Sequence, residues 1–295
     1  MTATGRRPFG CGTDTVTGSR VASRDSRPGC AGARGRGPAS SFGVVSEEAQ
    51  RRQRVLYDRI ADEYHAAEED AYSRRYSRVF MREPLLGDVS LAGKDVLDAA
   101  CGSGGITPYL VSRGARVTGL DISSREIELY RRRFPDCRAV CGSVLDTGFD
   151  DESFDRVVMS GALHHLHPDV QPALEEMCRV VRPGGMLCLI DPHSGSLADV
   201  FRKLWYRWDR RYFEANEASI DLKALVAANR SRLRLEYLRY GGGVAYLPVL
   251  QPLFLRIPNR WKRFYAAPLL YVERMLLPFQ SRRLSFFALY RLRRI

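Results

Sequence analysis

Two acidic residues and a glycine-rich turn are the parts of this sequence best suited to bind a ligand. Asp98 lies near the end of the apolar run in V-L-D-A-A-C-G-S-G-G, residues 96–105, and Gly102 and Gly104 follow it. Glycine lets a backbone approach a ligand where a β-carbon would collide with it. Asp121, in G-L-D-I-S, follows at the offset of about 20 residues at which a carboxylate accepts hydrogen bonds from ribose hydroxyls. The pattern predicts a site for a nucleoside-containing ligand.

The glycine turn differs from two common nucleotide-binding motifs. It reads G-S-G-G-I-T, so Thr107 takes the third glycine position of a dinucleotide fingerprint, and it lacks the lysine of a phosphate-binding loop. These departures weaken the interpretations as an NAD or an ATP site.

Histidines supply candidate proton acceptors. His165 lies in A-L-H-H-L and His193 in D-P-H, and each follows a predicted strand. Ligands of open α/β sheets bind at the carboxyl ends of strands, so both side chains are candidate catalytic bases, with a purely structural role as the alternative. Cys137 and Cys141 have no second cysteine pair, so we expect no metal site.

The elements that position these residues alternate between strand and helix. Apolar runs predict strands at 95–100, 116–120, 137–141, 154–159 and 186–190, with helices from Gly105, at 124–133 and at 170–180; a helix over 213–225 and strands at 233–240 and 284–292 follow. Such alternation predicts an α/β fold with a doubly wound, mostly parallel sheet and helices on both faces.

Several sequence blocks together resemble the class I S-adenosylmethionine-dependent methyltransferases, in particular the small-molecule group with the pattern L-D-x-x-C-G-x-G. Besides the glycine turn, these blocks are Y-D-R-I-A-D-E-Y at 57–64, F-D-D-E-S-F-D-R-V-V-M at 149–159, A-L-H-H-L at 162–166 and R-V-V-R-P-G-G at 179–185. The resemblance covers about half of the chain. It implies a Rossmann-like seven-stranded sheet, methyl transfer to a small-molecule or lipid-like acceptor, and S-adenosylmethionine as cofactor.

The resemblance also implies which residues line the cofactor site. The backbone around Ala100, Gly102 and Gly104 would hold the amino-acid end of the cofactor, and Asp121 the ribose. Ser143, in G-S-V, replaces an aspartate that binds the adenine amine in many family members. The other residues implied are Tyr64, Asp98, Ile122, Val144 and Ser160.

The net charge of +12 is unevenly distributed. Residues 1–45 carry a net +5, residues 46–200 a net −7 and residues 201–295 a net +14. A basic final third raises an alternative function, that of an RNA-binding or RNA-modifying methyltransferase. No N-P-P-Y or D-P-P-Y tetrapeptide follows the fourth strand, so we expect a small-molecule partner rather than nucleic acid. The seven unpatterned cysteines predict reduced thiols and a cytoplasmic protein.

Composition divides the chain into a tail and one methyltransferase domain. Residues 1–45 are rich in Arg, Gly, Ser and Pro and predict a disordered tail, unless translation begins near Val44. The domain, 46–295, comprises a helical cap (46–90), a cofactor-binding core (91–240), an insertion (241–283) and a final strand (284–295).

The insertion mixes apolar and aromatic residues with arginines. Three interpretations stay open: a cap over a hydrophobic substrate, a patch for peripheral contact with a membrane surface, and a second small core.

Overall fold

The structure is a computed structural model that describes residues 51, 55, 70–87, 89–208, 218–252 and 255–295. All of them belong to one compact unit, Arg34–Ile295. The predicted tail 1–45, the helix start at Ser46 and the candidate cofactor residue Tyr64 lie outside the described residues.

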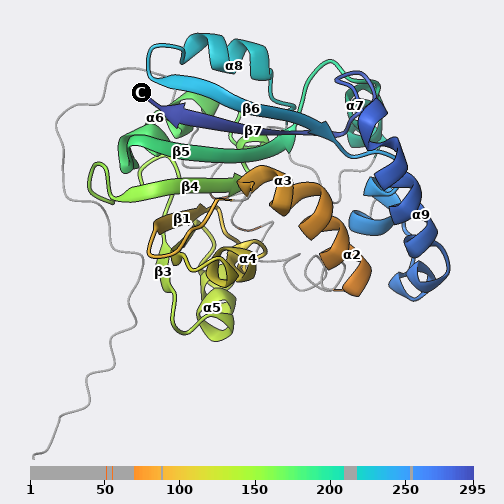
Figure 1. The fold of residues 1–295 in the computed structure, drawn as a ribbon, viewed down its shortest axis with the longest axis horizontal. Helices are drawn as coiled ribbons and strands as arrows, with labels where there is room; N and C mark the ends of the chain where they lie inside the picture. Colours follow the sequence, from red (N-terminus) through yellow and green to blue (C-terminus); the bar gives the residue numbers. More distant parts are fainter. Residues whose placement is uncertain (1–50, 52–54, 56–69, 88, 209–217, 253–254) are drawn as a thin grey trace, which may run out of the picture. The chain divides into compact units, whose positions relative to one another are not determined.

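A seven-stranded sheet with the order β3-β2-β1-β4-β5-β7-β6 forms the framework of this unit (Figure 1). Strands β1 to β5 pair in parallel, and β7 runs antiparallel between β5 and β6. The strands are β1 (Asp95–Ala99), β2 (Arg116–Asp121), β3 (Arg138–Cys141), β4 (Phe154–Ser160), β5 (Val181–Pro192), β6 (Leu233–Gly241) and β7 (Phe287–Arg294). The predicted Rossmann-like, doubly wound sheet is confirmed.

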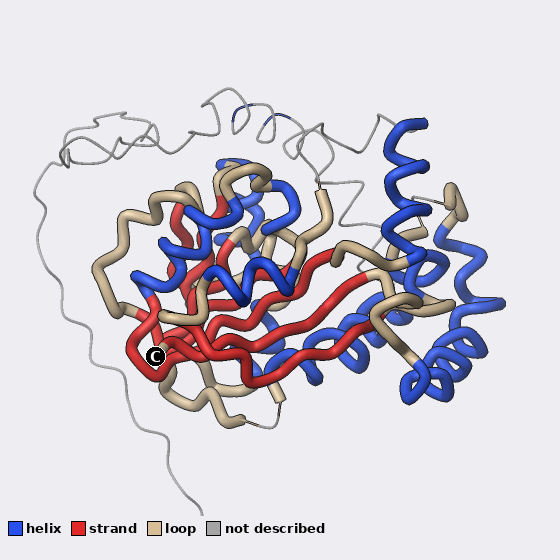
Figure 2. The backbone as a smooth tube through the Cα atoms, turned by 90° about the horizontal axis from the view of Figure 1, so that it is seen from above, coloured by secondary structure: helices blue, strands red, loops and turns tan. Residues whose placement is uncertain are grey.

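Helices cover both faces of the sheet because the central strands are apolar on both sides. In β1, Leu97 and Ala99 belong to one core layer and Val96 to the other, as the two-residue period of a strand requires. The first layer packs under α6 (Val170–Val180) and α8 (Leu222–Ala228). The second packs under α3 (Glu83–Leu86) and α4 (Thr107–Ser112). Figure 2 shows helices on both sides of the strands.

Three elements begin three or more residues away from their predicted starts. Strand β5 begins at Val181, five residues earlier than expected, because Val181 pairs with Phe154 before a bulge in the β4–β5 ladder. Strand β7 begins at Phe287, not at 284, because the Leu197 N–H donates to the Arg283 carbonyl and holds the chain in a turn. Helix α8 begins at Leu222 because the Asp221 side chain caps it; the earlier part of that predicted helix, 209–217, lies outside the described residues.

The segment between β6 and β7 folds back onto helices near the start of the described chain. It contains η3 (Tyr246–Leu250), η4 (Asn259–Trp261), α9 (Lys262–Leu276) and η5 (Leu277–Phe279). Helix α9 and η3 contact α2 (Ala71–Tyr76), which continues into the π-helical turn η1 (Ser77–Arg82) (Figure 1). The remaining helices are α5 (Ser124–Arg133), η2 (Leu163–His165) and α7 (Leu197–Trp208). Among the described residues, no helix is long and apolar enough to cross a membrane.

Candidate cofactor and active site

The turn after β1 has a backbone conformation that favours glycine. Ala100 has a φ of 54° and Gly102 a φ of 50°, both in the left-handed region. A non-glycine residue in this region is strained, and such strain concentrates at ligand sites. A β-carbon added to Gly102 would have Glu126 Oε2 as its nearest neighbour, at 3.7 Å, so the space beside this residue is open enough for a close ligand.

Asp121 joins the end of β2 to this turn. Its Oδ2 accepts a hydrogen bond from the Gly102 N–H at 2.8 Å, and its Oδ1 accepts one from the Ser123 N–H at 2.8 Å. The carboxylate is half-buried at the carboxyl edge of the sheet, and each oxygen has a second lone pair for a further donor. This donor and acceptor chemistry fits a cofactor that carries ribose hydroxyls. Ile122, next in the chain, is also half-buried.

Gly104 serves packing. Its φ is 91°, and a β-carbon there would lie 2.3 Å from Phe134 Cε2 and 3.1 Å from a ring atom of Tyr130. Its N–H donates to the Cys101 carbonyl at 2.9 Å. Close approach of Tyr130 and Phe134 is therefore one reason for a glycine at this position, and its contact with a cofactor stays a prediction.

Asp98 is buried beneath the turn. The Thr107 hydroxyl donates to Asp98 Oδ2 at 2.7 Å and lies 3.1 Å from the Tyr130 hydroxyl. Burial raises the pKa of Asp98 to about 7, against the opposing effect of the hydrogen bond from Thr107. This carboxyl therefore titrates near neutral pH.

The loop after β3 carries Ser143 and Val144. The Ser143 hydroxyl accepts a hydrogen bond from the Leu145 N–H at 3.2 Å, and Val144 is buried in the core. Sequence reasoning did not single out Glu126, whose buried carboxylate lies beside Gly102. Its signal was the spacing S-S-R-E at 123–126, a capping box in which the Ser123 side chain accepts from the Glu126 N–H at 3.1 Å.

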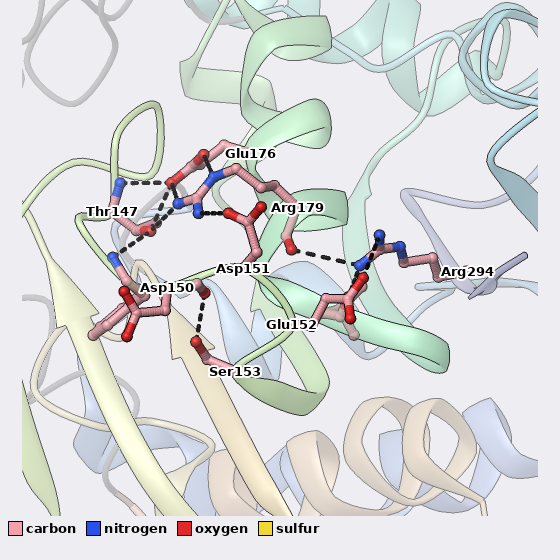
Figure 3. Close-up of polar contacts among 10 residues, drawn as sticks. Thr147, Asp150, Asp151, Glu152, Ser153, Glu176, Arg179 and Arg294 are labelled. Carbon is pink, nitrogen blue, oxygen red and sulfur yellow. Dashed lines mark hydrogen bonds and ion pairs between the residues drawn. The ribbon is translucent and has the colours of Figure 1, made fainter. Parts of the chain in front are cut away.

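A polar clamp holds the other end of the loop after β3 (Figure 3). Glu176, on α6, accepts hydrogen bonds from the N–H of Thr147 at 2.9 Å and from its hydroxyl at 2.6 Å. Arg179 donates to both Glu176 oxygens at 2.7 Å and to Asp151 at 2.5 Å. Part of the block F-D-D-E-S-F-D thus belongs to a structural clamp, which lies just before the start of β4 and away from the carboxyl edge.

The strand order changes direction between β1 and β4. Ala99 is paired with Met159, so Ala100 and Ser160 leave the sheet side by side. In the sheet, β2 and β3 lie on one side of β1, and β5 lies on the opposite side of β4. Open α/β folds bind ligands at such a change of strand order. Ser160 is exposed there.

A histidine–aspartate pair that the sequence did not reveal lies at the same edge. His164 Nδ1 is 3.0 Å from Asp191 Oδ1, and the His164 N–H donates to the same oxygen at 3.3 Å. Asp191 is buried, and its Oδ2 has no hydrogen-bond partner among the described residues. Burial raises the pKa of Asp191 and lowers that of His164. The sequence indicated this pair only through one acidic residue, Asp191, at the end of the apolar run L-C-L-I-D.

The two candidate bases lie in different surroundings. The His165 ring packs against that of His164, with centroids 3.8 Å apart, and is half-buried at the carboxyl edge. His193 is buried, with Nδ1 3.1 Å from the Ser194 carbonyl and Nε2 2.8 Å from the Ser285 hydroxyl. Both ring nitrogens of His193 are engaged, so in this conformation it offers no lone pair to a substrate.

The fold is the Rossmann-like fold of class I S-adenosylmethionine-dependent methyltransferases. Burkholderia thailandensis 1,6-didemethyltoxoflavin-N1-methyltransferase, solved with 1,6-didemethyltoxoflavin and S-adenosylhomocysteine, superposes with a TM-score of 0.52 at 17% identity, covering 87% of this chain and 93% of that one. Residues 97–189 match the family model for a methyltransferase domain. This match confirms the resemblance inferred from the sequence and the expected cofactor class.

Curated relatives match part of the chain. The chain is 43% identical over 101 residues to a phthiotriol/phenolphthiotriol dimycocerosates methyltransferase of Mycobacterium tuberculosis, covering 33% of this chain and 37% of the relative. It is 34% identical over 136 residues to a demethylmenaquinone methyltransferase of Beutenbergia cavernae, covering 46% and 56%. The chain thus spans between about one third and just over half of the length of these relatives.

Proposed function

We propose that this protein transfers a methyl group from S-adenosylmethionine to a lipid-like small molecule. The observation that carries the proposal is the strained turn at Ala100 and Gly102, tied to Asp121 at the carboxyl edge of β1 and β2. The bound cofactor would supply an electrophilic methyl group whose bond to sulfur breaks as the acceptor's lone pair forms the new bond. The residues of this chain would bind, align and exclude water.

In this proposal the cofactor residues divide into three groups. The backbone from Ala100 to Gly104 and the buried Asp98 lie at the amino-acid end, and Asp121 with Ile122 at the ribose. Ser143 and Val144 lie at the adenine, where the clamp at Thr147 keeps their loop in place. Ser160 would lie on the side of the acceptor, and Tyr64, in the predicted helical cap, would close the site.

A hydroxyl or phenol acceptor must also lose a proton. We propose His165 as its acceptor, because its ring lies at the carboxyl edge and is held by His164, which Asp191 orients. His193 remains a proposed catalytic residue only for a conformation in which its bond to Ser285 opens. His164 and Asp191 act through His165 and are positioning residues.

The lipid-like acceptor class rests on the relatives and on composition. Two relatives are named for phthiotriol/phenolphthiotriol dimycocerosates and for demethylmenaquinone as their substrates. The segment between β6 and β7 is apolar and aromatic and joins the sheet at the same edge as the proposed site. The alternative, an RNA-modifying methyltransferase, rests only on the basic charge of the final third.

Titration calorimetry with S-adenosylmethionine and S-adenosylhomocysteine tests the cofactor site. We expect micromolar binding that falls at least tenfold in Asp121→Ala, because two ribose hydrogen bonds to a charged group are lost. Glu128→Gln is the matched control, since this exposed acid on α5 faces solvent. Failure of the intact chain to bind either compound would overturn the proposal.

Methyl transfer to a phenolic lipid analogue tests the base. His165→Asn should lower kcat about 10²-fold with cofactor affinity unchanged. Asp191→Asn should lower kcat less and shift its pH profile, as expected for a positioning residue. A His165→Asn variant with full turnover would remove this residue from the mechanism.

A further inference from the structure

Helix α9 exposes Phe264 and Tyr271 to solvent and buries the charged residues Lys262 and Glu273 in the protein interior. Phe264, Tyr271 and Met275 are spaced by seven and four residues, which places them on one face of the helix. Phe264 is 64% exposed and Tyr271 67% exposed, and Trp261 and Phe279 extend this apolar stripe beyond both ends of α9. Monomeric soluble proteins rarely expose a contiguous apolar patch of this kind without a partner.

Buried polar contacts fix this orientation of the helix. Lys262 is 1% exposed, and its Nζ donates to Asp70 Oδ2 at 2.5 Å and to the Ser73 hydroxyl at 2.7 Å, both at α2. Glu273 is fully buried and accepts hydrogen bonds from the N–H groups of Gly243 and Ala245. Rotating α9 to bury its aromatic residues would leave these two charges without partners, so the stripe is held outward.

The charge around the stripe has one sign. Glu273 is the only acidic residue from Gly242 to the end of the sequence, and it is buried. Five arginines in the same part of the sequence are exposed; they are Arg256, Arg260, Arg263, Arg274 and Arg283. Arg274 lines a cavity together with Tyr271 and Met275 of the stripe. Arg263 lies over the Phe264 ring at 4.6 Å. Within residues 242–295, exposed aromatic and apolar groups are thus combined with arginines and with no exposed acidic side chain, a combination that complements an anionic lipid surface.

An apolar cavity opens beside the stripe. It has a volume of about 250 Å³ and lies between η1 and α9, lined by Val79, Phe80, Leu270, Tyr271 and Met275 with two arginines. The stripe and the cavity share Tyr271 and Met275. A lipid chain that leaves the bilayer at this face would meet an apolar surface.

We propose that the face of α9 formed by Trp261, Phe264, Tyr271, Met275 and Phe279 docks the protein on the surface of an anionic lipid bilayer. The aromatic residues enter the interface, and the exposed arginines pair with lipid phosphates. Strands β6 and β7, which carry this segment, meet β5 at the pair Phe287 and Pro192, close to the proposed active site. Docking does not depend on methyl transfer, but it would deliver the lipid-like acceptor of the proposed function.

Vesicle flotation of the full chain tests this proposal. At low salt we expect binding to vesicles of phosphatidylcholine with phosphatidylglycerol, and at least tenfold weaker binding to phosphatidylcholine alone. The triple variant Phe264→Ser, Tyr271→Ser, Met275→Gln should lose binding. Arg260→Gln with Arg263→Gln should weaken binding to anionic vesicles about 25-fold, since each basic residue near the surface contributes about fivefold.

Two controls separate this face from general basicity. Val111→Ser and Arg132→Gln change exposed residues on α4 and α5 and should bind like the unchanged chain. The tryptophan emission should shift to the blue on anionic vesicles, and this shift should shrink in Trp261→Phe. Binding that survives the triple variant, or retention of RNA with no retention of vesicles, would overturn the proposal. Cofactor titration of the same variants is expected to be unchanged, so failure of docking and failure of the cofactor site are distinguishable.

Discussion

The sheet around β1 and the segment between β6 and β7 differ in which residues they bury and which they expose to solvent. Around β1 the interior is apolar, with Asp98 as a buried acid beneath the functional turn. In α9 the interior side holds Lys262 and Glu273, while Phe264 and Tyr271 face outward. The first pattern, with apolar residues inside, is typical of a protein domain that is surrounded by water. The second indicates a helix whose outer face is adapted to a less polar environment.

The largest expected effect comes from removing the buried acid of the insertion. Glu273→Ala leaves the N–H groups of Gly243 and Ala245 and the side chain of Gln280 without an acceptor. We expect a loss of about 3–5 kcal/mol in the free energy of unfolding, because a buried charge network is broken. Hydrogen exchange should rise in α9 and η3 and stay unchanged in β1. An equal rise of hydrogen exchange in β1 and α9 would show that the two regions do not differ in this way. Glu273→Gln keeps an acceptor oxygen and should have a smaller effect than Glu273→Ala.

Asp98 provides the corresponding test in the cofactor-binding half. Its pKa rises from 3.8 to about 7 on folding. Between these values the folded chain holds a proton that the unfolded chain has lost, so stability is greatest below pH 4 and falls as the pH rises through 7. Above pH 7 the free energy of unfolding is expected to be lower by up to about 4 kcal/mol than below pH 4. Urea unfolding from pH 4 to 8 should show this decline, and Asp98→Asn should flatten it; an unchanged pH dependence would contradict the assignment.

The clamp on the loop after β3 should have an intermediate effect. Burial opposes ionisation of Glu176, but hydrogen bonds from Arg179 and Thr147 hold its pKa below the ordinary value. Arg179→Ala should lower the free energy of unfolding by about 2 kcal/mol at pH 7. In the unchanged chain this contribution is present above pH 4.5 and is lost as the pH falls below it. Arg182→Ala, at a more exposed ion pair, is the control and should cost less.

The smallest effect is expected at the sheet edge formed by β6 and β7. Hydrogen bonds from Arg293 and Arg234 lower the pKa of Glu236 to about 2. The ion pair is partly exposed, so Glu236→Gln should cost less than about 1 kcal/mol at pH 7. The difference between the two proteins should vanish as the pH falls from 4 to 2. A cost above 2 kcal/mol would show that this surface pair stabilises the strands more than the clamp does.

The sheet could be predicted from sequence because its signals are local. Each parallel strand is a short apolar run that ends in a turn, and β1 in particular ends in an acid and glycines, as at 96–105. Most candidate cofactor residues were proposed from the same signals, since they lie at or just after the ends of strands, as Asp121 and Ser160 do, and their contact with the cofactor stays a prediction. Strand bounds were less accurate where a bulge or a turn set them, as at Val181 and Phe287.

The remaining features depend on contacts between distant residues. The pair of His164 and Asp191 joins η2 to β5, and Lys262 meets Asp70 across 192 residues of sequence. In both pairs, the residues next to one partner in the sequence do not indicate which distant residue it contacts. The outward orientation of the α9 aromatics could not be predicted either, because an apolar stripe normally marks the buried side of a helix.

The segment between β6 and β7 leaves and re-enters the sheet at one point, since Gly241 is paired with Phe287. A short hairpin could therefore replace the whole segment without displacing a strand. Under the two proposals made above, docking belongs to this segment and methyl transfer to the sheet, so the surface that the protein binds could be changed without a change to the reaction.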